Sequence, residues 1–179
     1  MTRYARYTGE KVYLTALTLD DAEAITKWYN DPDVAYYMDE HREVKSLLTV
    51  REEVAEMTKS GAAFAIFDKE NDILIGYSKC GSSFEFLIGE KNYWHKGYDI
   101  EALGFLMDFD FNIRNRNIIT VCAYSHDERA LACYEEAGFK KVLTYRERML
   151  RGREKFDLIF MDMLASEYFE MQRGLCNEL

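Results

Sequence analysis

Hydrophobic residues recur along this chain with two different periods, and the change from one period to the other separates strands from helices. From Val12 to Leu17 apolar and polar residues alternate, which predicts a short strand. After Thr18, which forms a capping-box sequence with Asp21, the spacing becomes helical. The segment Asn30-Asp31-Pro32-Asp33 then stops this helix. Its apolar positions are Ala22, Ile25, Trp28 and Tyr29.

Helical spacing returns after the proline. A short helical turn carries Val34, Tyr36, Tyr37 and Met38, and a longer helix is expected from about Glu43 to Lys59, where Ser60-Gly61 ends it. The inner stripe of the longer helix is formed by Leu47, Val50, Val54 and Met57.

The middle of the chain reads as strands. Ala62 to Phe67 and Ile73 to Tyr77 are two apolar runs joined by a polar connection, which predicts a β-hairpin. A third strand, Phe84 to Ile88, follows a turn of small residues. This arrangement favours antiparallel pairing.

The second half of the chain mixes both periods. The run Ile118 to Ala123 is mostly apolar and rich in β-branched residues, so we expect it to be buried on both faces. Together with the earlier elements this order predicts the α/β or α+β class with a mixed sheet. The other expected elements are a helix from Ile100 to Ile113, a helix from Glu128 to Ala137 closed by Gly138, and a hairpin of Phe139 to Leu150 with Lys155 to Leu164.

Size and composition indicate one folded domain over residues 1–179. The 179 residues are 48% hydrophobic and 31% charged, as in ordinary globular proteins. No apolar run approaches the roughly 18 residues of a membrane helix, and the N-terminus lacks the apolar core of a signal peptide. We therefore expect a cytoplasmic protein with no membrane partner.

Charge and cysteine usage narrow the function further. A net charge of −9 argues against a general nucleic-acid binder and fits a cationic partner. The four cysteines form no C-x-x-C pair, and only three histidines are present, so we expect free thiols and no metal site.

The stretch from Tyr93 to Ala102 is the first candidate for chemistry. It joins an expected strand to an expected helix, and it contains Gly97 with two basic neighbours, His95 and Lys96. A helix start offers unpaired N–H groups and the positive end of the helix dipole, and a glycine lets the backbone approach a phosphate. This turn therefore suits an anion.

Three ordered motifs resemble the GCN5-related N-acetyltransferases (GNAT), and among them the group that acetylates ribosomal-protein N-termini and polyamines. The resemblance covers nearly the whole chain, from Val12 to Tyr168. The family's Q/R-x-x-G-x-G/A loop corresponds to residues 94–99, and Ile100-Glu101-Ala102 corresponds to its Thr-Glu-Ala helix start. Its second motif, N-x-x-A followed by Tyr and Gly-Phe, corresponds to Asp127, Ala130, Tyr134, Gly138 and Phe139, and its closing hairpin to Arg146-Glu147, Gly152 and Asp157.

This resemblance implies a GNAT fold, with a mostly antiparallel central sheet of six to seven strands flanked by helices, and acetyl-CoA as co-substrate. The strand Phe84 to Ile88 is expected to splay from Ile118 to Ala123, so that Phe86, Leu87 and Ile88 bind the pantetheine arm through their backbone. The pyrophosphate is then expected over the N–H groups of Lys96 to Ile100. The full implied cofactor set is Phe86, Leu87, Ile88, His95, Lys96, Gly97, Tyr98, Asp99, Ile100, Asp127, Arg129 and Tyr134.

Two side chains are candidates for proton transfer. Tyr134 occupies the family's acid position, although on an amphipathic helix it also suits a packed core position. Glu85, beside the pantetheine strand, can accept a proton directly or through water, or form a surface salt bridge. His126, just before Asp127, either reaches the site or is a solvated loop histidine, and the second interpretation is favoured.

Two acidic residues depart from the family pattern. Asp99 stands where the family has Gly or Ala, so its carboxylate either opposes the pyrophosphate, caps the N–H groups of Glu101 and Ala102, or points away. Asp127 replaces Asn and exchanges an amide for a group that only accepts hydrogen bonds.

The leading hypothesis is an acetyl-CoA-dependent N-acetyltransferase that acts by direct attack of a primary amine, either a protein N-terminus or a polyamine-like molecule. The alternative is a non-catalytic sensor or interaction protein of the same fold. Early carboxylates favour a cationic acceptor, and exposed aromatics at Tyr36, Tyr37 and Tyr168 suggest a homodimer. These carboxylates are Asp31, Asp33, Asp39 and Glu40.

Overall fold

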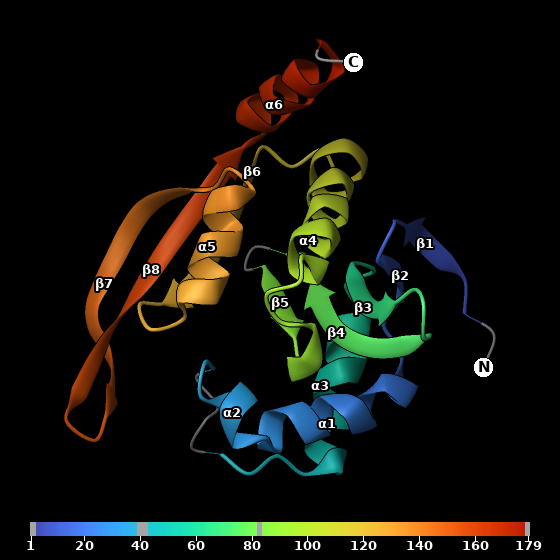
Figure 1. Cartoon of the computed structure of the whole chain (residues 1–179). Helices are drawn as coiled ribbons and strands as arrows, with labels where there is room; N and C mark the ends of the chain where they lie inside the picture. Colours follow the sequence, from blue (N-terminus) through green and yellow to red (C-terminus); the bar gives the residue numbers. More distant parts are fainter. Residues whose placement is uncertain (1–2, 39–42, 82–83, 178–179) are drawn as a thin grey trace. The chain divides into compact units, whose positions relative to one another are not determined.

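The computed structural model describes residues 3–38, 43–81 and 84–177, and the chain divides into two compact units, residues 1–102 and 103–179. Each unit is described by itself below, with its elements labelled as in Figure 1. None of the helices in the described ranges combines the length and the apolar character that crossing a membrane requires.

The first unit contains a five-stranded sheet in which every strand runs antiparallel to its neighbour, in the order β1-β2-β3-β4-β5. The register places Leu14 opposite Ile66 and Tyr77 opposite Leu87. The predicted strands are confirmed, and β1 is an addition whose mostly exposed residues gave no alternating pattern. The strands are β1 (Ala5–Thr8), β2 (Val12–Ala16), β3 (Ala63–Asp68), β4 (Ile73–Lys79) and β5 (Glu85–Ile88).

Most helices of this unit follow β2 and precede β3 in the sequence. The predicted capping box is present, and the N–H of Thr18 donates to Asp21 at 2.8 Å. The third helix begins at Leu47, four residues later than expected from the apolar pattern, because Ser46 accepts a hydrogen bond from the N–H of Thr49 and caps it there. The elements are the 3₁₀ turn η1 (Leu19–Asp21), α1 (Ala22–Asn30), α2 (Pro32–Ala35), α3 (Leu47–Thr58) and the 3₁₀ turn η3 (Lys91–Tyr93).

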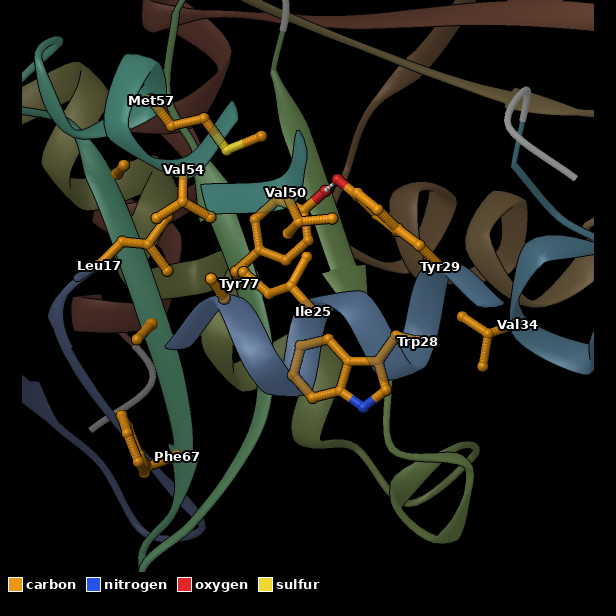
Figure 2. Packing of buried hydrophobic residues seen from close by; sticks show 13 residues of the cluster. Leu17, Ile25, Trp28, Tyr29, Val34, Val50, Val54, Met57, Phe67 and Tyr77 are labelled. Atoms are coloured by element: carbon orange, nitrogen blue, oxygen red, sulfur yellow. Dashed lines mark hydrogen bonds between the residues drawn. The ribbon is translucent and has the colours of Figure 1, made fainter. Parts of the chain in front are cut away.

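Helices α1 and α3 bury their apolar faces against one face of this sheet, as Figure 2 shows. Ile25 of α1 and Val50 of α3 are fully buried. The hydroxyl groups of Tyr29 and Tyr77 form a hydrogen bond of 2.6 Å inside this core, which satisfies both polar ends without solvent. The predicted inner stripe of α3 is confirmed at Val50, Val54 and Met57, and Leu47 packs against it half-buried.

The second unit contains a three-stranded antiparallel sheet in the order β6-β8-β7. Helix α4 begins in the first unit and ends in the second, and α5 and α6 follow β6 and β8 in the chain. The fold class is confirmed, although the eight strands found in residues 3–38, 43–81 and 84–177 form two antiparallel sheets. The elements are α4 (Tyr98–Asp108), the π-helical turn η4 (Phe109–Ile113), β6 (Ile118–Tyr124), α5 (Glu128–Glu136), β7 (Lys140–Arg151), β8 (Glu154–Leu164) and α6 (Ala165–Asn177).

Three features of this unit differ from the sequence prediction. Strand β6 is not buried on both faces, because Ile118 and Cys122 are exposed while Ile119 and Val121 are buried. In the part of the chain that the structure describes, β6 pairs only with β8, so it is an edge strand and keeps the alternation of a half-exposed sheet. The predicted helix 100–113 begins earlier, at Tyr98, and its last turn is π-helical. Helix α6 was not predicted.

One contact fixes the chain just after β5. A Cβ atom at Gly89 would lie 2.1 Å from the ring of Trp28, so the indole packs directly on the glycine backbone. Trp28 also donates its Nε1–H to Glu90 at 3.0 Å. The buried tryptophan therefore anchors the loop after β5 to helix α1.

We predict that Gly89→Ala destabilises the protein by at least about 2 kcal/mol, because the added methyl group must displace a packed indole ring. Gly104→Ala is the matched control, since nothing lies within 4 Å of a Cβ at this helical position. The control is expected to be neutral or to stabilise by about 0.5–1 kcal/mol. Urea denaturation of both variants checks this, and equal free energies of unfolding would contradict it.

Candidate active site

The turn between β5 and α4 is folded back onto the end of β5. Trp94 donates its Nε1–H to the carbonyl of Ile88 at 2.8 Å, and its ring meets the ring of Tyr37 edge to face, with 5.9 Å between centroids. Tyr93 donates its hydroxyl to Asp68 at 3.2 Å. Two aromatic side chains, those of Tyr93 and Trp94, therefore tie the turn to strands β3 and β5.

The backbone of this turn is open to an anion. His95 and Gly97 have positive φ angles of 58° and 78°, and α4 begins directly afterwards at Tyr98. Within the described residues, the N–H groups of residues 96–99 form no hydrogen bond of good geometry to a protein acceptor, so any bond that closes the turn around His95 is long or bent. Unpaired N–H groups at a helix start form an anion-binding surface. The geometry therefore suits the pyrophosphate that the sequence placed here.

Lys11 is a third basic residue at this turn, and the sequence analysis missed it. Its ammonium group donates to the carbonyl of Lys96 at 2.7 Å and lies 3.1 Å from the Cβ position of Gly97. The lysine comes from the connection between β1 and β2, so only folding brings it to the turn. With His95 and Lys96, whose backbone forms part of the turn, Lys11 brings the number of basic residues at the turn to three.

The carboxylate of Asp99 binds within its own turn. Its Oδ1 accepts the N–H of Ile100 at 3.1 Å, whereas the N–H of Glu101 donates to the carbonyl of Gly97 at 3.3 Å. We expected the Asp99 carboxylate to accept the N–H groups of Glu101 and Ala102, but it accepts the N–H of Ile100 instead. The carboxylate occupies one of the five amides expected to bind pyrophosphate and leaves the other four open.

The free edge of β5 presents fewer backbone groups than the sequence implied. The Leu87 carbonyl would lie 2.2 Å from a Cβ at Gly76, so it faces β4. Alternation along an antiparallel strand then directs the backbone groups of Phe86 and Ile88 to the other edge. There the carbonyl of Ile88 already accepts the Trp94 indole. Phe86 is the residue of β5 best placed for a pantetheine arm.

Glu85 lies at the start of β5 and forms an ion pair with Lys79 across the β4–β5 register, at 3.3 Å. Its side chain is 41% exposed. The expected salt bridge of Glu85 is therefore present. A catalytic role for Glu85 stays a prediction.

In the second unit, Asp127 is the N-cap of α5. Its Oδ1 accepts the N–H of Ala130 at 3.1 Å and lies 3.8 Å from Nε of Arg129. Asp and Asn cap helices about equally well, because either side-chain oxygen accepts the same N–H. The replacement of Asn by Asp therefore preserves the local structure of the motif.

Tyr134 projects from α5 into the interior of its unit and is 5% exposed. Burial raises the pKa of its hydroxyl well above the ordinary value of 10. A phenol in this state keeps its proton at neutral pH, so Tyr134 can donate a hydrogen bond and does not ionise. The neighbouring His126 is half-buried and packs against Tyr124 and Phe156, so it is not a solvated loop residue.

The acidic residues expected to attract a cationic acceptor are partly neutralised. Lys91 forms ion pairs with Asp31 at 2.9 Å and with Asp33 at 2.6 Å. The hydrogen bond from Lys91 lowers the pKa of Asp31. Asp39 and Glu40 lie outside the described residues.

Two of the three tyrosines that were expected to be exposed at a dimer surface are not exposed. Tyr168 is 3% exposed and stacks on Phe111, and Tyr37 packs on Trp94. Only Tyr36 of the three is exposed.

The described residues were expected to hold no metal ion. Among these residues no group of three or more His, Cys, Asp or Glu side chains is arranged to hold a metal ion. Cys80, Cys122 and Cys133 are not joined by disulfide bonds among the described residues, and the Cys176 side chain lies outside the described part.

Comparison with known proteins identifies the family. The family model described as "Acetyltransferase (GNAT) domain" matches residues 11–140, and the chain belongs to this family of N-acetyltransferases. A curated relative, the uncharacterised N-acetyltransferase p20 of Bacillus licheniformis, is 26% identical over 178 residues, which cover 89% of this chain and 96% of the relative. Acetyl transfer to an amine is thus the activity of the family, which favours the enzyme over the non-catalytic alternative.

Two solved structures share the fold. Spermidine N-acetyltransferase from Vibrio cholerae, crystallised with CoA and spermine, has a TM-score of 0.78 and 22% identity, and the match covers 90% of this chain and 99% of that one. A ribosomal-protein-S5-alanine acetyltransferase from Vibrio fischeri has a TM-score of 0.71 and 14% identity, with coverage of 90% and 97%.

We predict that Lys11→Met weakens CoA binding about three- to tenfold, because it removes one exposed cation from the turn. Lys69→Met is the matched control, since Lys69 also donates to a backbone carbonyl, that of Gly9, at 2.7 Å. Isothermal titration calorimetry with CoA measures both variants. Equal affinities of the two variants would show that Lys11 has no part in binding.

We predict that Asp127→Asn leaves the free energy of unfolding nearly unchanged, whereas Asp127→Ala lowers it by about 1 kcal/mol through loss of the helix cap. Thermal denaturation distinguishes the two. A destabilised Asn variant would mean that the negative charge, rather than the cap, is needed at this position.

Proposed function

We propose that this chain transfers the acetyl group of acetyl-CoA to a primary amine by direct attack of the amine. The proposed acceptor is a protein N-terminus or a polyamine-like small molecule. The observation that carries the proposal is the turn after β5, where four backbone N–H groups form no hydrogen bond of good geometry within the described residues and where the ammonium group of Lys11 lies.

The first unit would hold the nucleotide end of the co-substrate. The amides of residues 96–99 suit the pyrophosphate, and Lys11 and Lys96 add positive charge beside them. Gly97 adopts a left-handed conformation that favours glycine, which keeps the backbone open at this point. Asp99 opposes a phosphate less than an unbound carboxylate would, because its Oδ1 is already bound to Ile100.

The chemical step needs a neutral amine, a group that accepts its proton, and a donor toward the leaving sulfur. When bound, acetyl-CoA supplies a thioester carbonyl that an amine can attack. Tyr134 keeps its proton because burial raises its pKa, so it would act as a hydrogen-bond donor at its Oη. Glu85 would accept a proton directly or through water once its pairing with Lys79 opens.

The acceptor site is proposed to favour a substrate with a single amino group over a polyamine. Lys91 neutralises part of the charge on Asp31 and Asp33, and Lys27 does the same for Glu90 at 2.9 Å. A polyamine with several positive charges needs several uncompensated carboxylates. The ion pairs therefore support a single N-terminal amine over a polyamine.

We predict that release of CoA thiol from acetyl-CoA is faster with peptides bearing a free N-terminus than with spermidine at equal concentration. Tyr134→Phe is expected to lower kcat about 100-fold. The control Tyr168→Phe alters another buried tyrosine of the same unit and is expected to keep activity. Absence of turnover with every peptide and polyamine would contradict the proposal, and equal activity of the two variants would exclude Tyr134 as the donor.

A further inference from the structure

Strand β7, together with the turn after it and the first two residues of β8, has a charge opposite to that of the whole chain. Residues 140–155 contain seven Lys and Arg but only two Glu, a net charge of +5. The whole chain has a net charge of −9, so the remainder has −14. Basic residues are thus concentrated in one element of an acidic protein.

Strand β7 presents these residues along a free edge. In the sheet order β6-β8-β7 (Figure 1) it pairs with β8 and with no other strand of the described residues. Nearly all of its 12 residues are exposed. An edge strand offers unpaired N–H and C=O groups to an added strand. Within the described residues no strand occupies the outer edge of β7.

A wide bulge fixes the shape of this edge. Tyr145 pairs with Leu158 and Met149 with Phe156, so three residues of β7 face Asp157 alone. Glu147, at the centre, has a φ of 52°, and its N–H donates to Asp157 at 2.8 Å.

The bulge is tied to the neighbouring strand as well. The N–H of Asp157 donates to Oγ of Ser125 at 3.1 Å, and the N–H of Ser125 donates to the carbonyl of Asp157 at 2.8 Å. These bonds hold the bulge at the end of β6. The bulged residues, which include Arg146 and Arg148, are therefore displayed on a fixed backbone.

Three arginines of the hairpin have no acidic partner within the described part of the chain. Lys155 pairs with Glu147 at 2.6 Å, and Lys141 with Glu135 at 3.0 Å. Lys140 pairs with Glu167. The exposed residues Arg146, Arg148 and Arg153 have no ion pair of this kind. Their charge is available to a partner.

Apolar side chains are interleaved with these charges. Val142 is 54% exposed, Leu143 45%, Tyr145 49% and Leu150 51%. A strand that shows apolar and basic side chains beside a free backbone edge matches an extended peptide with apolar and acidic side chains.

We propose that the outer edge of β7 binds an extended acidic polypeptide segment as an added strand. The charge distribution argues for a short peptide over a nucleic acid, because a long polyanion meets the net charge of −14 elsewhere on the chain. It also argues against pairing of β7 with β7 of a second copy, since both edges are basic. This binding does not depend on acetyl transfer.

The test is fluorescence anisotropy with a labelled decapeptide that alternates Glu with Val and is blocked at both ends, in the absence of acetyl-CoA. We expect the peptide to bind, and its analogue with Lys in place of Glu not to bind. N-methylation of alternate peptide bonds is expected to abolish binding, because it removes the donors of an added strand.

The variants are Arg146→Gln/Arg148→Gln/Arg153→Gln and the control Arg6→Gln/Arg51→Gln/Lys59→Gln, which removes three exposed cations from the first unit. The hairpin variant is expected to bind the peptide about tenfold more weakly and the control less than twofold. Tighter binding of a ten-nucleotide RNA than of the peptide would overturn the proposal. Unchanged peptide binding by the hairpin variant would also overturn it. If that variant in addition self-associated, the three arginines would serve only to keep the β7 edges of separate copies apart.

Discussion

The packing of Trp28 on Gly89 is the constraint on which the candidate site depends. The indole leaves no room for a side chain at Gly89 and donates its N–H to Glu90, so helix α1 fixes the point where the chain leaves β5. Trp94 then binds the carbonyl of Ile88 and folds the following turn back onto the strand. Two tryptophans thus set where α4 begins, and the open amides of residues 96–99 follow from that start.

Electrostatics then decides what the turn can bind. Asp99 and Glu101 place two carboxylates in the first turn of α4, which alone would disfavour a phosphate. Both are engaged, Asp99 with the N–H of Ile100 and Glu101 with the N–H groups of Glu10 and Lys11 at 2.5 and 2.9 Å. Glu101 thereby helps to hold Lys11, whose ammonium reaches the carbonyl of Lys96. Glu101 therefore helps to position the ammonium group of Lys11, and neither carboxylate prevents a phosphate from binding at the turn.

Periodicity predicted most of the strands and helices, because their apolar faces are buried within single units. It failed for β1, which is mostly exposed, and for the outer face of β6, where apolar Ile118 remains exposed. Motif spacing identified the turn and Tyr134 as candidates. The sequence could not reveal Lys11, because a lysine 85 residues from Lys96 reaches its carbonyl only through the pairing of the strands. It also could not show that Asp99 binds its own turn, since that depends on one side-chain rotamer.

The central claim is that the amides of residues 96–99 are open for the pyrophosphate of CoA. Titration of isotopically labelled protein with CoA, followed through backbone amide resonances, tests it directly. The account predicts that the largest shifts fall on Lys96, Gly97, Tyr98 and Asp99, with a smaller effect at Ile100, whose N–H already binds Asp99. CoA binding that shifts other amides and leaves these four unchanged would contradict it.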